Sequence, residues 1–212
     1  MNKKLIYSII GIIIFFLLIF GIYCATTIQD KKIKQLERQI VHLKEEIVPI
    51  RFKILERKND SIFFSLKFYD MDRHLIHFYD EESGEKKEFI RIKMPGQELA
   101  LDFIVVPIGN RFLAFPYKVL SDAIAPKDGI ILFKYYYRDN FPQIYYSMDN
   151  SPAFNGGVKV LFEKIIKGDI QDIKDIFGSL VQDVQNIKQF EIGYIYRVVF
   201  HPAKGGIEII QE

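Results

Sequence analysis

The densest group of side chains that could carry out chemistry lies in residues 69–82, which read YDMDRHLIHFYDEE. The possible metal ligands in this stretch are Asp70, Asp72, His74, His77, Asp80, Glu81 and Glu82. A metal ion needs ligands that converge on one point, but residues 74 and 77 of a strand would point to opposite faces. Asp70 and Asp72 instead suit a turn, where carboxylates accept hydrogen bonds from backbone amides. We therefore predict turn and surface roles for this group, and no metal site.

Five tyrosines offer a second kind of chemistry, the binding of a peptide or a glycan to an aromatic groove. They are Tyr135, Tyr136, Tyr137, Tyr145 and Tyr146. Aromatic residues are also frequent in strands, so a division of these tyrosines between core and surface is the favoured interpretation. The chain contains neither the phosphate-binding motif Gly-x-x-x-x-Gly-Lys nor the nucleophile motif Gly-x-Ser-x-Gly. The sequence therefore predicts no catalytic residue and no cofactor.

The placement of charge says more than its total. The chain of 212 residues has a net charge of +2, and the charged residues before position 28 are Lys3 and Lys4. Residues 28–212 are therefore neutral overall, and no run of Lys and Arg interleaved with aromatic residues occurs along the sequence. Nucleic-acid-binding domains need a basic footprint, so we predict no nucleic-acid partner. Cys24 is the single cysteine, which excludes an internal disulfide.

Residues 5–25 form an uncharged stretch dominated by Ile, Phe and Leu. At about 1.5 Å rise per residue, a helix of this length crosses the roughly 30 Å hydrocarbon core of a bilayer. The stretch is longer than the apolar region of a cleaved signal peptide, so we predict a retained transmembrane helix. A lipoprotein in which Cys24 carries the lipid is the alternative. Tyr23 stands before Cys24, where such processing prefers a small residue.

The orientation of the predicted helix rests on the basic residues around it. Lys3 and Lys4 precede the helix in a short tail, residues 1–4, which is typical of a signal-anchor with its N-terminus in the cytoplasm. Basic residues also follow the helix, from Lys31 to Arg38, and their number alone would favour the reverse orientation. We predict a single-pass protein of the cytoplasmic membrane, with its C-terminal part outside the cytoplasm.

Residues 28–48 carry a heptad pattern that predicts a coiled-coil stalk. Its apolar positions are Ile33, Leu36, Ile40, Leu43, Ile47 and Ile50. Ile at position a with Leu at position d favours parallel two-stranded coils. The repeat is short, but two anchored chains share a plane and so have a high effective concentration. Gly21 and Ala25 add a small-xxx-small contact in the membrane. We predict a parallel homodimer, or pairing with a similarly stalked membrane protein. A lone helix lying on the domain is the alternative.

From residue 51 onward apolar and polar residues alternate, which is the period of a half-buried strand. Residues 61–69, SIFFSLKFY, are the clearest example. Further strands are expected at residues 73–79, 88–94, 99–108, 110–120, 129–137, 142–147, 190–200 and 206–210. Strands joined by such short turns pair in antiparallel fashion. We predict an α+β domain at residues 51–212, with a mostly antiparallel sheet, sandwiched or rolled, that a C-terminal hairpin completes.

One or two helices are expected in the C-terminal half of this domain. One is short and runs through residues 158–166, and Gly168 marks its end. The other is indicated by apolar residues at helical spacing, namely Ile170, Ile173, Phe177, Leu180, Val184 and Ile187. Gly178 interrupts its apolar stripe, so we expect this helix to pack on the sheet and not to form a second coiled coil.

Together these elements predict a bitopic, non-catalytic scaffold or interaction protein of a bacterial cell envelope. Its expected partners are membrane lipid, a second stalked chain and other envelope proteins. Frequent Ile, Lys and Phe point to a bacterial source. A ligand-binding sensory or accessory subunit is an alternative, weakened by the four-residue tail, which has no room for an output domain. An anchored metal-dependent hydrolase is another, weakened by the ligand geometry of residues 69–82.

Overall fold

A computed structural model describes residues 46–80, 83–108, 111–147, 150–168, 181–184 and 187–212. The chain divides into two units, residues 1–44 and 45–212, and every described residue belongs to the second unit. The predicted tail, the predicted transmembrane helix and most of the predicted stalk lie outside the described residues. Within the described residues, no helix combines the length and the apolar character needed to cross a membrane.

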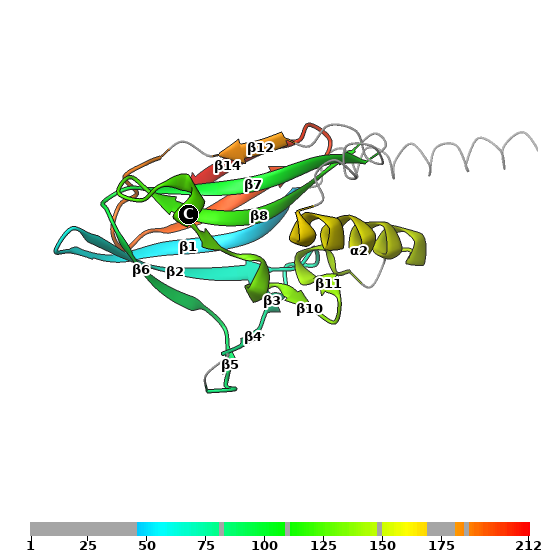
Figure 1. Cartoon of the computed structure of the whole chain (residues 1–212), viewed down its shortest axis with the longest axis horizontal. Coiled ribbons are helices and arrows are strands. Elements are labelled where there is room, and N and C mark those ends of the chain that lie inside the picture. The colour runs from blue at the N-terminus through cyan, green and yellow to red at the C-terminus, as the bar shows by residue number, and fades with distance from the viewer. Residues whose placement is uncertain (1–45, 81–82, 109–110, 148–149, 169–180, 185–186) are drawn as a thin grey trace, which may run out of the picture. The chain divides into compact units, whose positions relative to one another are not determined.

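Two larger sheets dominate the second unit (Figure 1). The larger sheet has six strands, β14-β13-β1-β2-β3 in order, with β6 also paired to β2. Their bounds are β1 Ile47–Lys58, β2 Ser61–Tyr69, β3 Leu75–Ile76, β6 Ile90–Pro95, β13 Ile195–His201 and β14 Gly206–Gln211. The second sheet has the order β12-β7-β8-β9. Its strands are β7 Leu99–Ile108, β8 Arg111–Ser121, β9 Ile130–Ile131 and β12 Val181–Val184.

Shorter elements connect and flank these sheets. Two small ladders pair β4 (Phe78–Tyr79) with β5 (Lys86–Lys87) and β10 (Tyr137–Arg138) with β11 (Phe141–Pro142). Three 3-10 helices are η1 (Pro126–Asp128), η2 (Phe133–Tyr135) and η3 (Gln143–Tyr145). The described residues contain one α-helix, α2 (Pro152–Lys167). All ladders between these strands are antiparallel.

The alternation in residues 61–69 explains how β2 is held. Ile62, Phe64, Leu66 and Phe68 are buried, while the residues between them are half-exposed. Buried side chains of both larger sheets and of α2 belong to a single hydrophobic core. The predicted domain, mostly antiparallel sheet with a helix in its C-terminal half, is therefore confirmed. The predicted strands 61–69 and 99–108 coincide with β2 and β7, and the C-terminal hairpin β13–β14 completes one edge of the larger sheet.

Helix α2 confirms the predicted short helix and extends it toward the N-terminus. Ser151 caps it, because the Ser151 hydroxyl accepts a hydrogen bond from the Phe154 amide at 3.2 Å. Pro152 occupies the first turn, where its missing N–H costs nothing. Gly168 ends the helix in a left-handed conformation at φ 76°. Leu161 and Phe162 face the core and fix the helix to it.

The predicted second helix is wrong at its C-terminal end. Residues 181–184 form strand β12, which pairs with β7 through Val181↔Val105 and Val184↔Asp102. Residues 169–180 lie outside the described residues. The spacing of apolar residues is a local signal. It carries no information on the backbone groups at the edge of β7, which need hydrogen-bond partners. Val184 therefore lies in a strand paired with that edge, although its spacing from the preceding apolar residues suits a helix.

The aromatic stretch 129–137 is not the single strand that the sequence predicts. It forms β9, the 3-10 helix η2 and the start of β10. The turn of η2 buries both Phe133 and Tyr136, which a strand would place on opposite faces. Residues 142–147 behave alike, because η3 buries both Ile144 and Tyr145. Core packing of aromatic residues prevails here over strand propensity.

The C-terminal end of the predicted stalk also needs correction. Ile47 and Ile50, assigned to stalk positions a and d, lie in β1, where they pair with Phe200 and Val198. The exposed fractions of Ile47 and Ile50 are 6% and 0%, so both side chains belong to the domain core. Pro49 lies where the register of β1 against β13 shifts, a position at which a missing N–H is tolerated. A stalk can therefore extend no further than residue 46 while β1 is formed.

Candidate functional site

Two of the metal-ligand candidates, Asp70 and Asp72, lie in the turn that follows β2, as predicted. The Asp70 carboxylate is largely buried; its Oδ1 accepts a hydrogen bond from the His74 amide at 2.8 Å, and its Oδ2 lies 3.3 Å from His74 Nδ1. Asp72 accepts a hydrogen bond from the Ser147 hydroxyl at 3.0 Å. These contacts close the turn that follows β2. They leave Asp70 and Asp72 engaged with separate neighbours.

The remaining candidates are separated in space or lie outside the described residues. His77 Nε2 is 3.8 Å from Glu88, whereas Asp80 accepts hydrogen bonds from the amide and hydroxyl of Ser83 at 2.9 and 3.0 Å. Glu81 and Glu82 fall outside the described residues. Among the described residues, no group of three or more His, Cys, Asp or Glu side chains is arranged to hold a metal ion.

The five tyrosines divide between core and surface. Tyr136 donates a hydrogen bond to the Pro116 carbonyl at 2.8 Å. The Tyr145 hydroxyl accepts from the Ala114 amide at 2.6 Å and donates to the Ala114 carbonyl at 2.8 Å. Burial raises the pKa of Tyr136 and of Tyr145, so both stay protonated and structural. Tyr135 and Tyr146 keep accessible surface.

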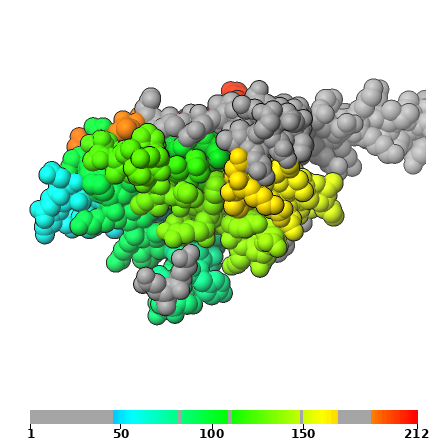
Figure 2. Space-filling view, in the orientation of Figure 1, coloured from blue at the N-terminus to red at the C-terminus, as the bar shows by residue number. Residues whose placement is uncertain are grey.

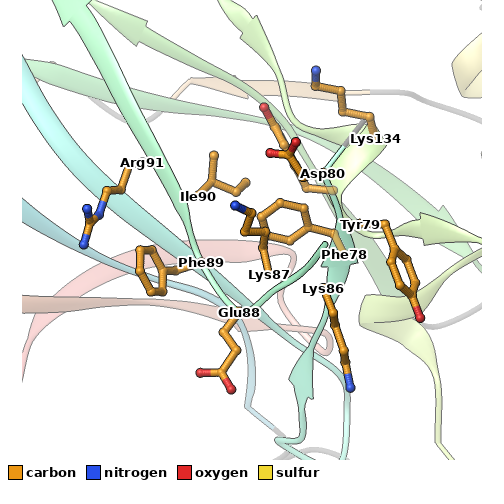
Figure 3. Close-up of a pocket in the computed structure, with 11 residues that line it drawn as sticks. Phe78, Tyr79, Asp80, Lys86, Lys87, Glu88, Phe89, Ile90, Arg91 and Lys134 are labelled. Atoms are coloured by element: carbon orange, nitrogen blue, oxygen red, sulfur yellow. The ribbon is translucent and has the colours of Figure 1, made fainter. Parts of the chain in front are cut away.

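The β4–β5 hairpin borders an open groove, shown in Figure 3, that Tyr135 also lines. The groove has a volume of about 830 Å³ and runs between the β4–β5 hairpin, the start of β6 and η2. Figure 2 shows this hairpin standing out from the body of the domain. The lining residues are Phe78, Tyr79, Asp80, Lys86, Lys87, Glu88, Phe89, Ile90, Arg91, Lys134 and Tyr135.

Cations and aromatic rings make up most of the groove. Four basic residues face two acidic ones, so the lining carries a positive excess. The ring of Phe78 meets that of Tyr135 edge to face at 5.4 Å, and Lys134 lies over the Tyr135 ring at 5.2 Å. Lys87 is paired with Glu85 at 3.1 Å. The groove can therefore bind a ring-bearing ligand with a negative group, but its lining offers no nucleophile beside a base.

A second depression of about 540 Å³ lies against the same hairpin. It shares Tyr79 and Lys86 with the first groove and adds Arg138 and Tyr146. The β4–β5 hairpin thus carries accessible aromatic and basic side chains that contribute to two depressions. Sequence reasoning missed this arrangement, because Lys134 and Arg138 lie far along the chain from Lys86. A signal was present in the Phe-Tyr and Lys-Lys pairs that flank the acidic turn 80–85.

Residues predicted to form the dimer interface divide between two parts of the chain. Ile33, Leu36, Ile40 and Leu43, and the membrane pair Gly21 and Ala25, lie outside the described residues. Ile47 and Ile50 lie in the core of the domain, as described above.

Comparisons with known proteins returned no match: no protein-family model, no curated protein and no solved structure is similar to this chain.

Proposed function

We propose that this chain is a membrane-anchored, non-catalytic interaction protein of a bacterial cell envelope. The observation that carries the proposal is the uncharged stretch 5–25, which has the length and composition of a membrane span. The β-rich domain begins at Ile47, about twenty residues after that stretch. We place the protein in the cytoplasmic membrane, with this domain outside the cytoplasm and available to other envelope proteins.

Pairing of two chains through residues 28–46 is part of the proposal. Ile33, Leu36, Ile40 and Leu43 provide four consecutive a and d positions. A coil this short is marginal in water, but anchoring in one plane raises the effective concentration of the partner. Gly21 and Ala25 would let two membrane helices approach closely. A homodimer or a pair with another stalked protein satisfies this pattern equally.

The proposed binding surface of the domain is the groove beside the β4–β5 hairpin. Its rings supply large, rigid contact area, and its basic residues supply orientation toward a negative group. The hairpin is joined to the larger sheet at β3 and β6, so the rigid core holds one side of the groove. This groove also favours the second candidate function, a ligand-binding sensory or accessory subunit.

Extraction and cross-linking test the proposal. The full chain should stay in the membrane pellet in alkaline carbonate, and a reporter fused after Glu212 should be active outside the cytoplasm. With Cys24 replaced by Ser, Leu36→Cys at position d should give a disulfide-linked pair in membranes. The matched control is His42→Cys at the solvated position c, which should cross-link far less. Release of the chain by carbonate as a monomer would refute the proposal.

Two measurements separate the alternatives. Mass spectrometry of the mature chain would detect lipid on Cys24 if the lipoprotein hypothesis holds. Metal analysis of the purified chain tests the anchored hydrolase, because stoichiometric bound metal would favour that function. We do not favour that function, because Asp70 and His74 are engaged with each other within one turn. A partner recovered from detergent extracts that is lost on Tyr79→Ala with Lys86→Ala would support the interaction role of the hairpin.

A further inference from the structure

The outer face of the larger sheet carries a cluster of basic residues that the linear sequence conceals. Residues such as Ile62 and Phe64 on β2 point into the core, so the residues between them point outward. The same alternation holds on the neighbouring strands β1 and β6. We call the basic residues of this surface the cationic face: Arg51, Lys53, Lys67, Arg91 and Lys93.

The strand register places four of these residues in two rows on either side of β2, and Lys67 lies on β2 itself. Lys53 lies opposite Ser65, and Ser65 lies opposite Arg91 on the other side, so a small residue separates two cations. Arg51 lies directly opposite Lys67. Since neighbouring strands are about 4.8 Å apart, the rows on β1 and β6 are separated by roughly 10 Å. Outward residues along one strand recur every 6.8 Å or so.

Aromatic side chains are interleaved with these cations. The charged groups lie over aromatic rings in three pairs: Arg51 over Tyr69 at 4.7 Å, Arg91 over Phe89 at 5.1 Å, and Lys93 over Phe63 at 5.4 Å. Such contacts orient a cation without neutralising it. The sequence shows no such interleaving, because Arg51 on β1 and Lys93 on β6 are 42 residues apart along the chain.

Most of this charge has no counterpart nearby. Arg51 is paired with Glu212 at 3.0 Å, and this contact, with Tyr69, raises the pKa of Arg51 against the opposing effect of its partial burial. The other four cations of the face have no carboxylate partner among the described residues. Like charges directly opposite on a sheet destabilise it, as with Arg51 and Lys67. A bound polyanion would relieve this repulsion.

We infer that the cationic face binds a linear polyanion that lies along β2 between the two rows of cations. Regularly spaced cations on an open face suit a chain of repeated phosphate or carboxylate groups better than one small anion. Lys53 and Lys67 are half-buried while Arg91 and Lys93 are exposed, so the surface is uneven. An uneven surface suits a narrow chain better than the plane of a bilayer. The inference does not depend on the proposed membrane anchor, and of the five cations only Arg91 also lines the groove.

Binding of labelled long-chain polyphosphate to the full chain, held in zwitterionic lipid nanodiscs, tests the inference. The face variant combines Lys53→Gln, Lys67→Gln, Arg91→Gln and Lys93→Gln. The control variant has the same net charge and combines Lys127→Gln, Lys159→Gln, Lys188→Gln and Lys204→Gln, all exposed positions away from the face. The face variant should lose at least tenfold in affinity at low salt, and the control less than twofold. The slope of log K against log salt should fall by about 3, at roughly 0.7 per contact.

Several outcomes would overturn the inference. Equal losses in both variants would mean that net charge alone drives binding. Competition by inorganic phosphate at the same concentration of phosphate groups would indicate a small-anion site. If the face variant lost binding to vesicles of anionic lipid but kept its binding to polyphosphate, the face would be a membrane-facing surface instead.

Two further arms keep the result interpretable. Poly-glutamate in place of polyphosphate separates a carboxylate from a phosphate polymer, and binding of either through the face supports the inference. If the fourfold variant does not fold, as judged by circular dichroism, the pair Arg91→Gln with Lys93→Gln replaces it. Both of these side chains are exposed, so the double variant should fold. Its salt slope should fall by about half as much as that of the fourfold variant.

Discussion

At the scale of single residues, the Tyr145 hydroxyl makes two buried hydrogen bonds to the backbone, whereas the Tyr136 hydroxyl makes one. The Tyr145 hydroxyl satisfies both the amide and the carbonyl of Ala114 in the buried strand β8. Tyr145→Phe would leave these two backbone groups without that partner, so the free energy of unfolding should fall by about 1–3 kcal/mol. Urea denaturation of the variant measures this loss. Tyr146→Phe, at an exposed position, is the matched control and should change stability by less than about 0.5 kcal/mol.

The Asp122 carboxylate makes the stability of the domain depend on pH at acidic values. This carboxylate accepts hydrogen bonds from the amides of Glu98 and Gln97 at 3.1 and 2.8 Å, which lower its pKa below the ordinary value of 3.8 despite some desolvation. A depressed pKa gives stability that is fully present above pH 3.8 and is lost as the pH falls through the folded-state pKa.

Unfolding of Asp122→Asn at several pH values therefore tests this assignment. The variant should be less stable than the parent at pH 7, and the difference should shrink as the pH falls below 3.8. Asp128→Asn, at an exposed position on η1, serves as the control. A constant difference between Asp122→Asn and the parent across this range would contradict the role of the Asp122 charge.

At the scale of elements, the turn between β6 and β7 depends on a glycine. Gly96 has φ 106°, and a Cβ at this position would collide with the Asp122 carboxylate. Gly96→Ala should therefore destabilise the domain by about 1–3 kcal/mol. Gly156→Ala in α2 is the contrasting control, because a Cβ there meets no neighbouring atom and alanine favours helix. It should stabilise by about 0.5–1 kcal/mol in the same thermal or urea unfolding measurement.

Local pattern predicted the elements that long alternation or a clear cap defines. Strand β2 and the end of α2 at Gly168 are examples. Prediction failed where distant residues decide the outcome, as for β12, which pairs with the edge of β7. The groove and the cationic face share this origin, because their side chains meet through strand register and not through sequence spacing. A single sequence contains the alternation, but not which strand lies beside which.

At the scale of the whole molecule, β1 connects the predicted membrane part to the domain. It lies inside the larger sheet, between β13 and β2, and it begins where a stalk must end. A strand in this position is held by ladders on both sides, so its first residues are part of the core. The chain therefore enters the domain through a strand at the centre of the larger sheet, an arrangement that the scaffold and the sensory hypotheses can both use.

Ile50 separates the two roles that its sequence position allows. As a core residue with an exposed fraction of 0%, it should cost about 2–5 kcal/mol of unfolding free energy when replaced by alanine. As a stalk residue it would leave the stability of residues 46–212 unchanged and weaken pairing of the full chain. Leu55→Ala on the exposed side of β1 is the control and should cost far less, because Leu55 is 40% exposed. Urea unfolding of residues 46–212, with Leu36→Cys cross-linking of the full chain in parallel, distinguishes these roles. A stable Ile50→Ala domain with reduced cross-linking would return Ile50 to the stalk.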